Sequence, residues 1–350
     1  MIFHILVGSY TNEIYTLAFD PNVPSLKLVS SVVVGHHPSW ITPHSTNPSL
    51  VYAGLEQPDG KIVAVEYDAE WRGKVVSEVS SGGADPCTLL AYKDELIIGN
   101  YSSASVVTLS LNPNPSQLDT SRVLSSSHLT GSGPNPERQK VPHPHQIIIH
   151  PEREELLVPD LGSDKVLRYF KTDSGIWETK GFVEYQPGGG PRHVAFYEGV
   201  LFTVLELSCY LAAHEFPPLP SSPKLIACLP TRHKPEPHPT GMLAAEILIP
   251  APNKTFTTPY IYVSNRNDPD STGDTIAIFS ASPFEFVAEV STGLEHLRGM
   301  VFGGEDDKWL VAGGVNGHGV KIFERVDGGK GLKEVVADMD IKAPTGFLWV

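Results

Sequence analysis

Charged residues occur at equivalent places in a repeating pattern of apolar runs. Pro144-His145 begins one run and Pro191-Arg192 begins another, and the runs that follow them end at Asp160 and Glu206. A histidine and a carboxylate can transfer protons, and an arginine can hold an anionic group through paired hydrogen bonds. The pattern therefore predicts acid/base chemistry on a small anionic ligand.

Comparing these two positions in every copy of the pattern collects the candidate site residues. One position follows the start of the first run, and the other lies at the end of the second run. Together they hold Glu56, Asn100, His145, Asp160, Arg192, Glu206, Asn265, Arg266 and Arg298. Arginine and glutamate are seldom buried without partners, so this mixture is improbable as core packing.

Structural interpretations are open for several of these residues. Arg192 could form a salt bridge with Glu206 or Asp160 between neighbouring repeats. Roles in turns or in backbone hydrogen bonding are also open for His143, His145, Asp160, Asn100 and Asn265.

The elements that position these residues repeat about every fifty residues. The first run of each unit begins at Pro38, Pro86, Pro144, Pro191, near Gly241, at Leu297 and at Pro344. Each unit holds short runs rich in Val, Ile, Leu, Phe and Tyr that are separated by turn residues, which is typical of an antiparallel meander. A unit of this length matches a four-stranded propeller blade, so we predict an all-β, seven-bladed β-propeller.

The two ends of the chain support one closed domain over residues 1–350. Residues 3–21 contain two strands without a preceding first strand, and residues 344–350 form a first strand without a successor. Placing the C-terminal strand in the N-terminal blade completes the seventh unit and removes exposed sheet edges. In each blade the second strand returns to the end where the first began, so the candidate residues should line one mouth of a central channel.

Two segments interrupt the repeat. Residues 113–141 are rich in Ser, Pro and Gly, and residues 217–240 are rich in Pro and His. Both are too long for hairpin turns and precede first strands, so we expect surface loops that overhang one face.

Composition narrows the class of ligand and the compartment. The formal net charge is -14, which disfavours nucleic acid and anionic membranes as partners. No apolar run approaches the ~18 residues of a membrane span, and the N-terminus resembles a strand rather than a signal peptide. Three widely spaced cysteines favour a reducing, cytoplasmic location. The oligomeric state stays open.

Four motifs resemble a known family. Pro142-His143-Pro144-His145, Val158-Pro159-Asp160-Leu161-Gly162, Gly190-Pro191-Arg192-His193 and Ser264-Asn265-Arg266 are similar to motifs of seven-bladed propeller lactonases. That family includes 6-phosphogluconolactonases of the cycloisomerase-2 type and the fungal 3-carboxy-cis,cis-muconate lactonising enzyme. The chain departs from the family pattern at Leu205, where members usually have Asn, and over the long segment 208–260.

The resemblance implies roles for the candidate residues. His145, Glu206, Arg192 and Arg266 are the expected catalytic residues, because they occupy the motif positions of the family. We expect substrate binding by Arg298, His143, Asn100, Asn265, Asp160 and Glu56. No metal and no cofactor are expected, although Glu56, Asn100, Asp160 and Asn265 carry oxygen atoms of the kind that Ca²⁺ takes.

Two reactions fit these residues. Three arginines around one mouth favour a substrate with several carboxylates, so the preferred expectation is a carboxymuconate cyclase in aromatic compound catabolism, with Arg192 and Arg266 holding carboxylates. The alternative is a hydrolytic lactonase of the 6-phosphogluconolactonase type, in which an arginine stabilises an oxyanion. A Ca²⁺-dependent sugar lactonase and a non-catalytic propeller scaffold are further alternatives.

Overall fold

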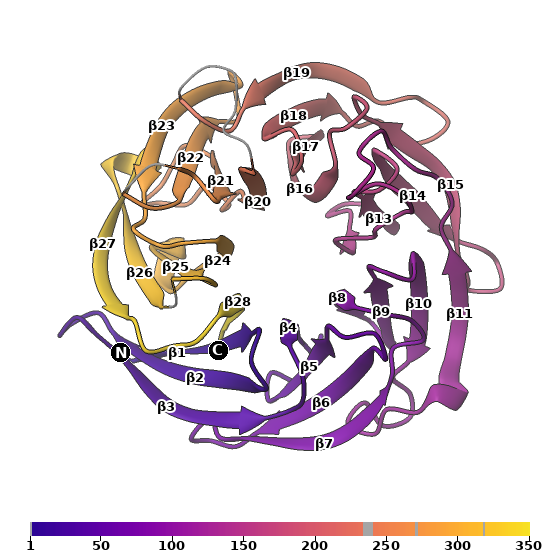
Figure 1. The fold of residues 1–350 in the computed structure, drawn as a ribbon, viewed down its shortest axis with the longest axis horizontal. Coiled ribbons are helices and arrows are strands. Elements are labelled where there is room, and N and C mark those ends of the chain that lie inside the picture. Colours follow the sequence, from indigo (N-terminus) through magenta and orange to yellow (C-terminus); the bar gives the residue numbers. More distant parts are fainter. Residues whose placement is uncertain (1, 234–240, 270–271, 318) are drawn as a thin grey trace. The chain divides into compact units, whose positions relative to one another are not determined.

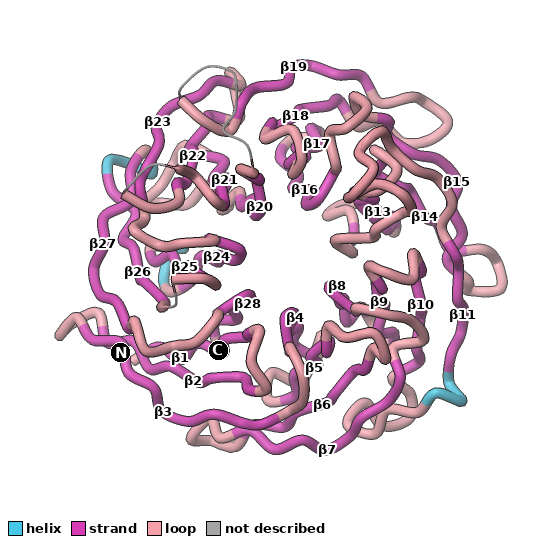
Figure 2. Tube along the Cα trace, viewed as in Figure 1, coloured by secondary structure: helices cyan, strands magenta, loops and turns pink. Residues whose placement is uncertain are grey.

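The computed structural model describes residues 2–233, 241–269, 272–317 and 319–350, and its regular secondary structure is almost entirely strand (Figures 1 and 2). The strands form seven four-stranded antiparallel sheets. Helical structure among the described residues is limited to three single 3₁₀ turns, namely η1 (Thr120–Arg122), η2 (Glu305–Asp307) and η3 (Asp327–Gly329). The chain is therefore the all-β, seven-bladed propeller that the repeat predicts.

Two compact units divide the chain. One is made of Pro191–Trp349 with two short N-terminal pieces, and the other is mainly Leu28–Gly190 with His4–Ala18. The three sheets of the second unit contain β4 (Pro38–Pro43), β5 (Leu50–Leu55), β6 (Lys61–Tyr67) and β7 (Gly73–Ser80); β8 (Pro86–Tyr92), β9 (Glu95–Asn100), β10 (Ser105–Ser110) and β11 (Val123–His128); and β12 (Ile148–Ile149), β13 (Glu155–Asp160), β14 (Lys165–Lys171) and β15 (Trp177–Glu184).

Three further sheets follow from Pro191 onward. They contain β16 (Pro191–Tyr197), β17 (Val200–Leu205), β18 (Tyr210–Glu215) and β19 (Lys224–Pro230); β20 (Leu243–Leu248), β21 (Tyr260–Arg266), β22 (Thr275–Ser280) and β23 (Glu285–Ser291); and β24 (Leu297–Gly303), β25 (Trp309–Gly314), β26 (Val320–Val326) and β27 (Gly331–Asp338). The seventh sheet has the order β28 (Pro344–Trp349), β1 (Phe3–Ser9), β2 (Glu13–Asp20) and β3 (Ser25–Val33), so the C-terminal strand completes it as predicted.

Apolar side chains pack between successive sheets and form the core. In the unit of Pro191–Trp349, Phe202 and Val204 of β17 pack with Ile261 and Val263 of β21. Second strands such as β5, β9 and β21 are buried along their whole length, because they have a strand on each side and a sheet against each face. Continuous burial explains why these strands read as unbroken apolar runs in the sequence.

The two segments expected as loops contain the fourth strands of their sheets, so that expectation was wrong. Residues 113–141 hold η1 and β11, and the described part of 217–240 holds β19, while 234–240 lie outside the described residues. A fourth strand is exposed on alternate residues or more; Leu225 and Ile226 in β19 are both exposed. Such strands lack the continuous apolar run that marks a buried strand.

A β-bulge near the start of the first strand recurs in five sheets. Pairing shifts by one residue at Ser39, Cys87, Arg192 and Arg298. In β20 the shift lies between Ala244 and Ile247. An extra, unpaired residue can direct its side chain away from the regular pleat. The residue that follows the start of each first run, which the repeat predicts to form the site, is thus the bulged residue of its strand.

Close backbone packing joins β28 to β24 within the unit of Pro191–Trp349. A Cβ atom at Gly299 would overlap the carbonyl oxygen of Thr345, and one at Gly303 would overlap the ring of Trp349. Glycine at these positions lets the two first strands approach closely.

Replacing Gly299 by alanine should therefore destabilise the fold. We expect Gly299→Ala to lower the free energy of unfolding by about 3 kcal/mol, because a backbone carbonyl cannot move aside. Gly175→Ala is the matched control, since no atom lies within 4 Å of that Cβ and its φ of +80° costs about 1 kcal/mol. Urea unfolding measures both; equal losses would contradict the packing argument.

Candidate active site

Arg192 and Arg266 both contact one buried carboxylate, and the charge of Arg298 acts on Arg192; we call Arg192, Arg266, Arg298 and Glu206 the arginine cluster. Glu206 follows the last residue of β17 and is fully buried. Arg192 Nε lies 2.9 Å from Glu206 Oε2, and Arg266 Nη2 lies 2.7 Å from the same oxygen. The carboxylate thus holds two guanidinium groups in place. The salt-bridge interpretation named this partner of Arg192, but the pair lies within one sheet and not between neighbouring repeats.

Backbone carbonyl groups of β20 provide further acceptors for these arginines. Arg192 Nη1 donates to the carbonyl of Ala245 at 2.6 Å, and Arg266 Nη2 donates to that of Ala244 at 3.3 Å. Burial lowers the pKa of Arg192 to about 10, and the charge of Arg266 acts in the same direction. Arg192 therefore still carries its charge at neutral pH.

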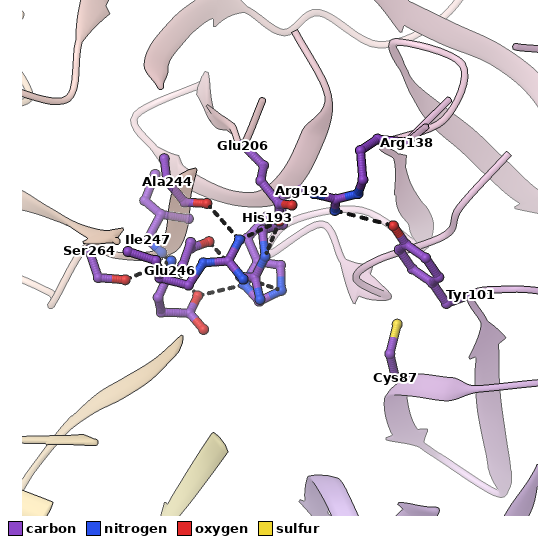
Figure 3. A network of polar contacts seen from close by, with 12 residues as sticks. Cys87, Tyr101, Arg138, Arg192, His193, Glu206, Ala244, Glu246, Ile247 and Ser264 are labelled. Atoms are coloured by element: carbon purple, nitrogen blue, oxygen red, sulfur yellow. Dashed lines mark hydrogen bonds and ion pairs between the residues drawn. The ribbon is translucent and has the colours of Figure 1, made fainter. Parts of the chain in front are cut away.

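A histidine and a second glutamate extend the network. His193 Nδ1 lies 2.7 Å from Glu246 Oε1, and Arg192 Nη1 lies 3.4 Å from His193 Nε2 (Figure 3). Burial lowers the pKa of His193, so its ring is neutral, donates from Nδ1 to Glu246 and accepts at Nε2. Glu246 lies in the bulge of β20, a site residue that the sequence missed because no proline or glycine marks that bulge.

The three arginines differ in their access to ligand. Arg192 and Arg266 are 2% and 4% exposed, whereas Arg298, in the bulge of β24, is half-buried. Three guanidinium groups and the single carboxylate of Glu206 give the arginine cluster a positive charge. The cluster is therefore suited to attract an anionic group, with Arg298 as its most exposed member.

The predicted histidines lie in the unit of Leu28–Gly190. The ring of His143 stacks on Tyr101 with centroids 4.1 Å apart, and its Nδ1 donates to the Tyr101 carbonyl oxygen at 2.9 Å. His145 is buried and contacts the edge of the Tyr101 ring at 5.6 Å. Arg138 Nη2 donates to the Tyr101 hydroxyl at 3.4 Å (Figure 3). Tyr101 thus organises both histidines.

Asp160 caps the turn beside these histidines. It accepts hydrogen bonds from the backbone N–H of His143 at 2.7 Å and of Gly162 at 3.0 Å, and from the Ser163 hydroxyl. Burial raises the pKa of Asp160. Pro144 joins Asp160 only through an isolated bridge, and regular pairing begins at β12. Asp160 therefore fixes the backbone that carries His143 and His145.

Asn100 and Asn265 make equivalent structural hydrogen bonds. Asn265 Nδ2 donates to the Thr231 carbonyl at 2.6 Å and to the Thr275 hydroxyl at 3.1 Å. Asn100 Nδ2 makes the same pair of bonds, to the Ser81 carbonyl and the Ser105 hydroxyl, each at 3.2 Å. Both asparagines are fully buried, and their amide groups tie the end of a fourth strand to the next sheet.

Glu56 lies beside Tyr10 and His37. The Tyr10 hydroxyl donates to both Glu56 oxygens, at 3.3 and 3.2 Å, and the His37 ring lies 5.0 Å from that of Tyr10. Burial lowers the pKa of His37, while the charge of Glu56 opposes this. Glu56 is thus in contact with polar groups of its own unit.

The predicted residues accordingly form two groups, one in each compact unit. Glu206, Arg192, Arg266, Arg298 and Asn265 belong to the unit of Pro191–Trp349, and His143, His145, Asp160, Asn100 and Glu56 belong to the other. In the described part of the chain, no group of three His, Cys, Asp or Glu side chains is arranged to hold a metal ion. No helix among these residues is long and apolar enough to cross a membrane.

The chain is similar to known proteins over nearly its whole length. The model of the family described as "Lactonase, 7-bladed beta-propeller" matches residues 4–349. An Arthroderma benhamiae protein named "Probable 6-phosphogluconolactonase" is 28% identical over 98% of this chain and 88% of its own. The 6-phosphogluconolactonase of Bacillus subtilis is 26% identical over 91% of this chain and 90% of its own.

A solved structure shows the same fold. The Pseudomonas aeruginosa periplasmic gluconolactonase superposes with a TM-score of 0.85 at 20% identity, covering 100% of this chain and 99% of its own. At that identity the likeness concerns the fold alone.

The hydrogen bonds of Asn265 lead to a stability prediction. Asn265→Ala removes the donor to the buried Thr231 carbonyl and the donor to the Thr275 hydroxyl, so we expect the free energy of unfolding to fall by about 2–3 kcal/mol. Asn22→Ala, at an exposed turn, should change it by less than about 0.5 kcal/mol. Urea unfolding tests both; a stable Asn265→Ala variant that binds substrate less tightly would instead favour the predicted binding role.

Proposed function

Because the chain belongs to the lactonase family of seven-bladed β-propellers, we propose that it is a hydrolytic lactonase of the 6-phosphogluconolactonase type. The match over residues 4–349 carries the proposal, and the names of the two full-length relatives support the hydrolytic reaction. The preferred expectation of a carboxymuconate cyclase in aromatic compound catabolism has no such support, so the hydrolytic alternative replaces it.

The arginine cluster suits both parts of a phosphorylated lactone. In the hydrolysis, water attacks the carbonyl carbon, the ring C–O bond breaks, and the ring oxygen takes a proton, which leaves a carboxylate and a hydroxyl group. A guanidinium group can stabilise the negative charge that develops on the carbonyl oxygen, and it can also hold a phosphate. Arg298 is the most exposed of the three and is the proposed first contact for the anion.

Glu206 and His145 have separate proposed roles. Glu206 Oε2 lies within 2.9 Å of both Arg192 and Arg266, so we assign Glu206 to hold the arginines rather than to move a proton. His145 keeps its predicted role in proton transfer, which rests on its motif. One domain over residues 1–350 and a cytoplasmic location also stay proposals; a single cooperative unfolding transition would support the former.

A substrate comparison tests the proposed reaction. With 6-phosphogluconolactone we expect acid release well above the spontaneous rate, and with 3-carboxymuconate we expect no loss of absorbance. Activity should persist in EDTA, which separates this enzyme from a Ca²⁺-dependent lactonase. Absorbance loss with the muconate and no acid release from the lactone would restore the cyclase; no activity on either would favour a binding scaffold.

Substitution of Arg266 tests the role of the arginine cluster. Arg266→Lys keeps a positive charge but loses the planar guanidinium group, whose Nη2 contacts both Glu206 and the Ala244 carbonyl. We expect kcat/KM for the lactone to fall about 100-fold, as for loss of an oxyanion donor. Arg72→Lys, on the exposed surface, is the control and should leave kcat/KM unchanged. Full activity of Arg266→Lys would contradict the assignment.

A further inference from the structure

A pocket of about 290 Å³ adjoins the arginine cluster within the unit of Pro191–Trp349. Asn267 and His296 line it, together with Asp268 and Asp274. Asn267 directly follows Arg266 at the end of β21, and His296 lies two residues before Arg298. The pocket is therefore lined by neighbours of two arginines that the proposed function uses.

The hydrogen bonds of Asn267 determine which nitrogen of His296 carries a proton. Asn267 Nδ2 donates to the Gly241 carbonyl at 3.1 Å, which fixes the orientation of the amide. Asn267 Oδ1 then accepts from His296 Nδ1 at 2.9 Å, so the proton is on Nδ1. His296 Nε2 consequently presents a lone pair, and among the described residues it has no partner.

Two carboxylates of the pocket are already used by the fold. Asp268 accepts two hydrogen bonds from Arg232, at 3.0 and 2.8 Å. Asp274 accepts from the backbone N–H of Asp268 at 2.7 Å and of Leu297 at 2.8 Å. These two carboxylates build part of the pocket wall, to which Glu295 and Asn316 also contribute, and the fixed tautomer makes His296 Nε2 a well-defined acceptor for a ligand.

The surroundings keep His296 uncharged. Burial lowers its pKa to about 4, and the charges of Arg266, Arg298 and Arg192 act in the same direction, against Glu206. Near neutral pH the ring is therefore neutral and accepts a hydrogen bond at Nε2 rather than donating one.

We propose that His296 is a specificity-determining residue, which accepts a hydrogen bond from a hydroxyl group of the ligand while the arginine cluster holds the anionic group. This inference rests on the proposed lactonase function and adds that the ligand has to carry a hydroxyl group that donates to His296. A hydroxylated ligand offers a donor to Nε2, whereas an ionised polycarboxylate offers only acceptors. The position thus discriminates between the two classes of substrate.

Binding of two matched acids tests the proposal. The probes are 6-phosphogluconate and 6-(phosphonooxy)hexanoate, which has the same chain, phosphate and carboxylate but no hydroxyl groups on the carbon chain. We expect the wild-type protein to prefer the hydroxylated acid, and His296→Asn to weaken its binding about tenfold, the value of one hydrogen bond, without affecting the other acid. Asparagine tolerates the left-handed φ of 57° at this position.

The control variant is His128→Asn, in the exposed strand β11, which should change the affinity for neither acid. Equal losses for both acids, no loss for either, or no wild-type preference would overturn the proposal. In ¹⁵N NMR spectra of the wild-type protein, a protonated His296 Nε2 at neutral pH would also overturn it. If the affinities and the tautomer are as expected but lactone hydrolysis is absent, only the proposed function fails.

Discussion

The β-bulge near the start of the first strand is the constraint on which the site depends. A regular strand would direct consecutive side chains alternately to the two neighbouring sheets, where a charged group has to be buried among apolar residues. The bulge leaves one residue out of the ladder, and in β16 and β24 that residue is an arginine. The same bulge holds Ser39 in β4 and Cys87 in β8, so it tolerates very different side chains.

Burying two guanidinium groups side by side would be costly without compensation. The ionised Glu206 offsets their repulsion, and the carbonyl groups of Ala244 and Ala245 satisfy donors that the carboxylate does not reach. The Ala245 carbonyl lies in the bulge of β20, and Ala244 is the last paired residue before that bulge. The bulge of one sheet thus supplies an acceptor to the arginine in the bulge of the preceding sheet.

Much of this arrangement could be predicted from the sequence, because buried strands leave unbroken apolar runs. The ends of β9, β13 and β21 were predicted to within one residue, at Asn100-Tyr101, Asp160-Leu161 and Asn265-Arg266, since a polar residue stops each run. The fourth strands β11 and β19 were missed because exposed strands lack a continuous apolar run. The β20 bulge was missed because no proline marks its start. The choice between a cyclase and a hydrolase could not be made from these residues, because an arginine binds carboxylate and phosphate alike.

Asn100 and Asn265 each fasten the residue that follows a fourth strand to the second strand of the next sheet. Thr231, which Asn265 binds, lies after the inserted residues before β19, so the chain enters the next sheet from a fixed point. An insertion before β19 is therefore separated from Arg266 of the next sheet by this fixed point. A scaffold with such a fixed point can accept changes in that outer segment during evolution while the positions of the buried charged residues stay the same.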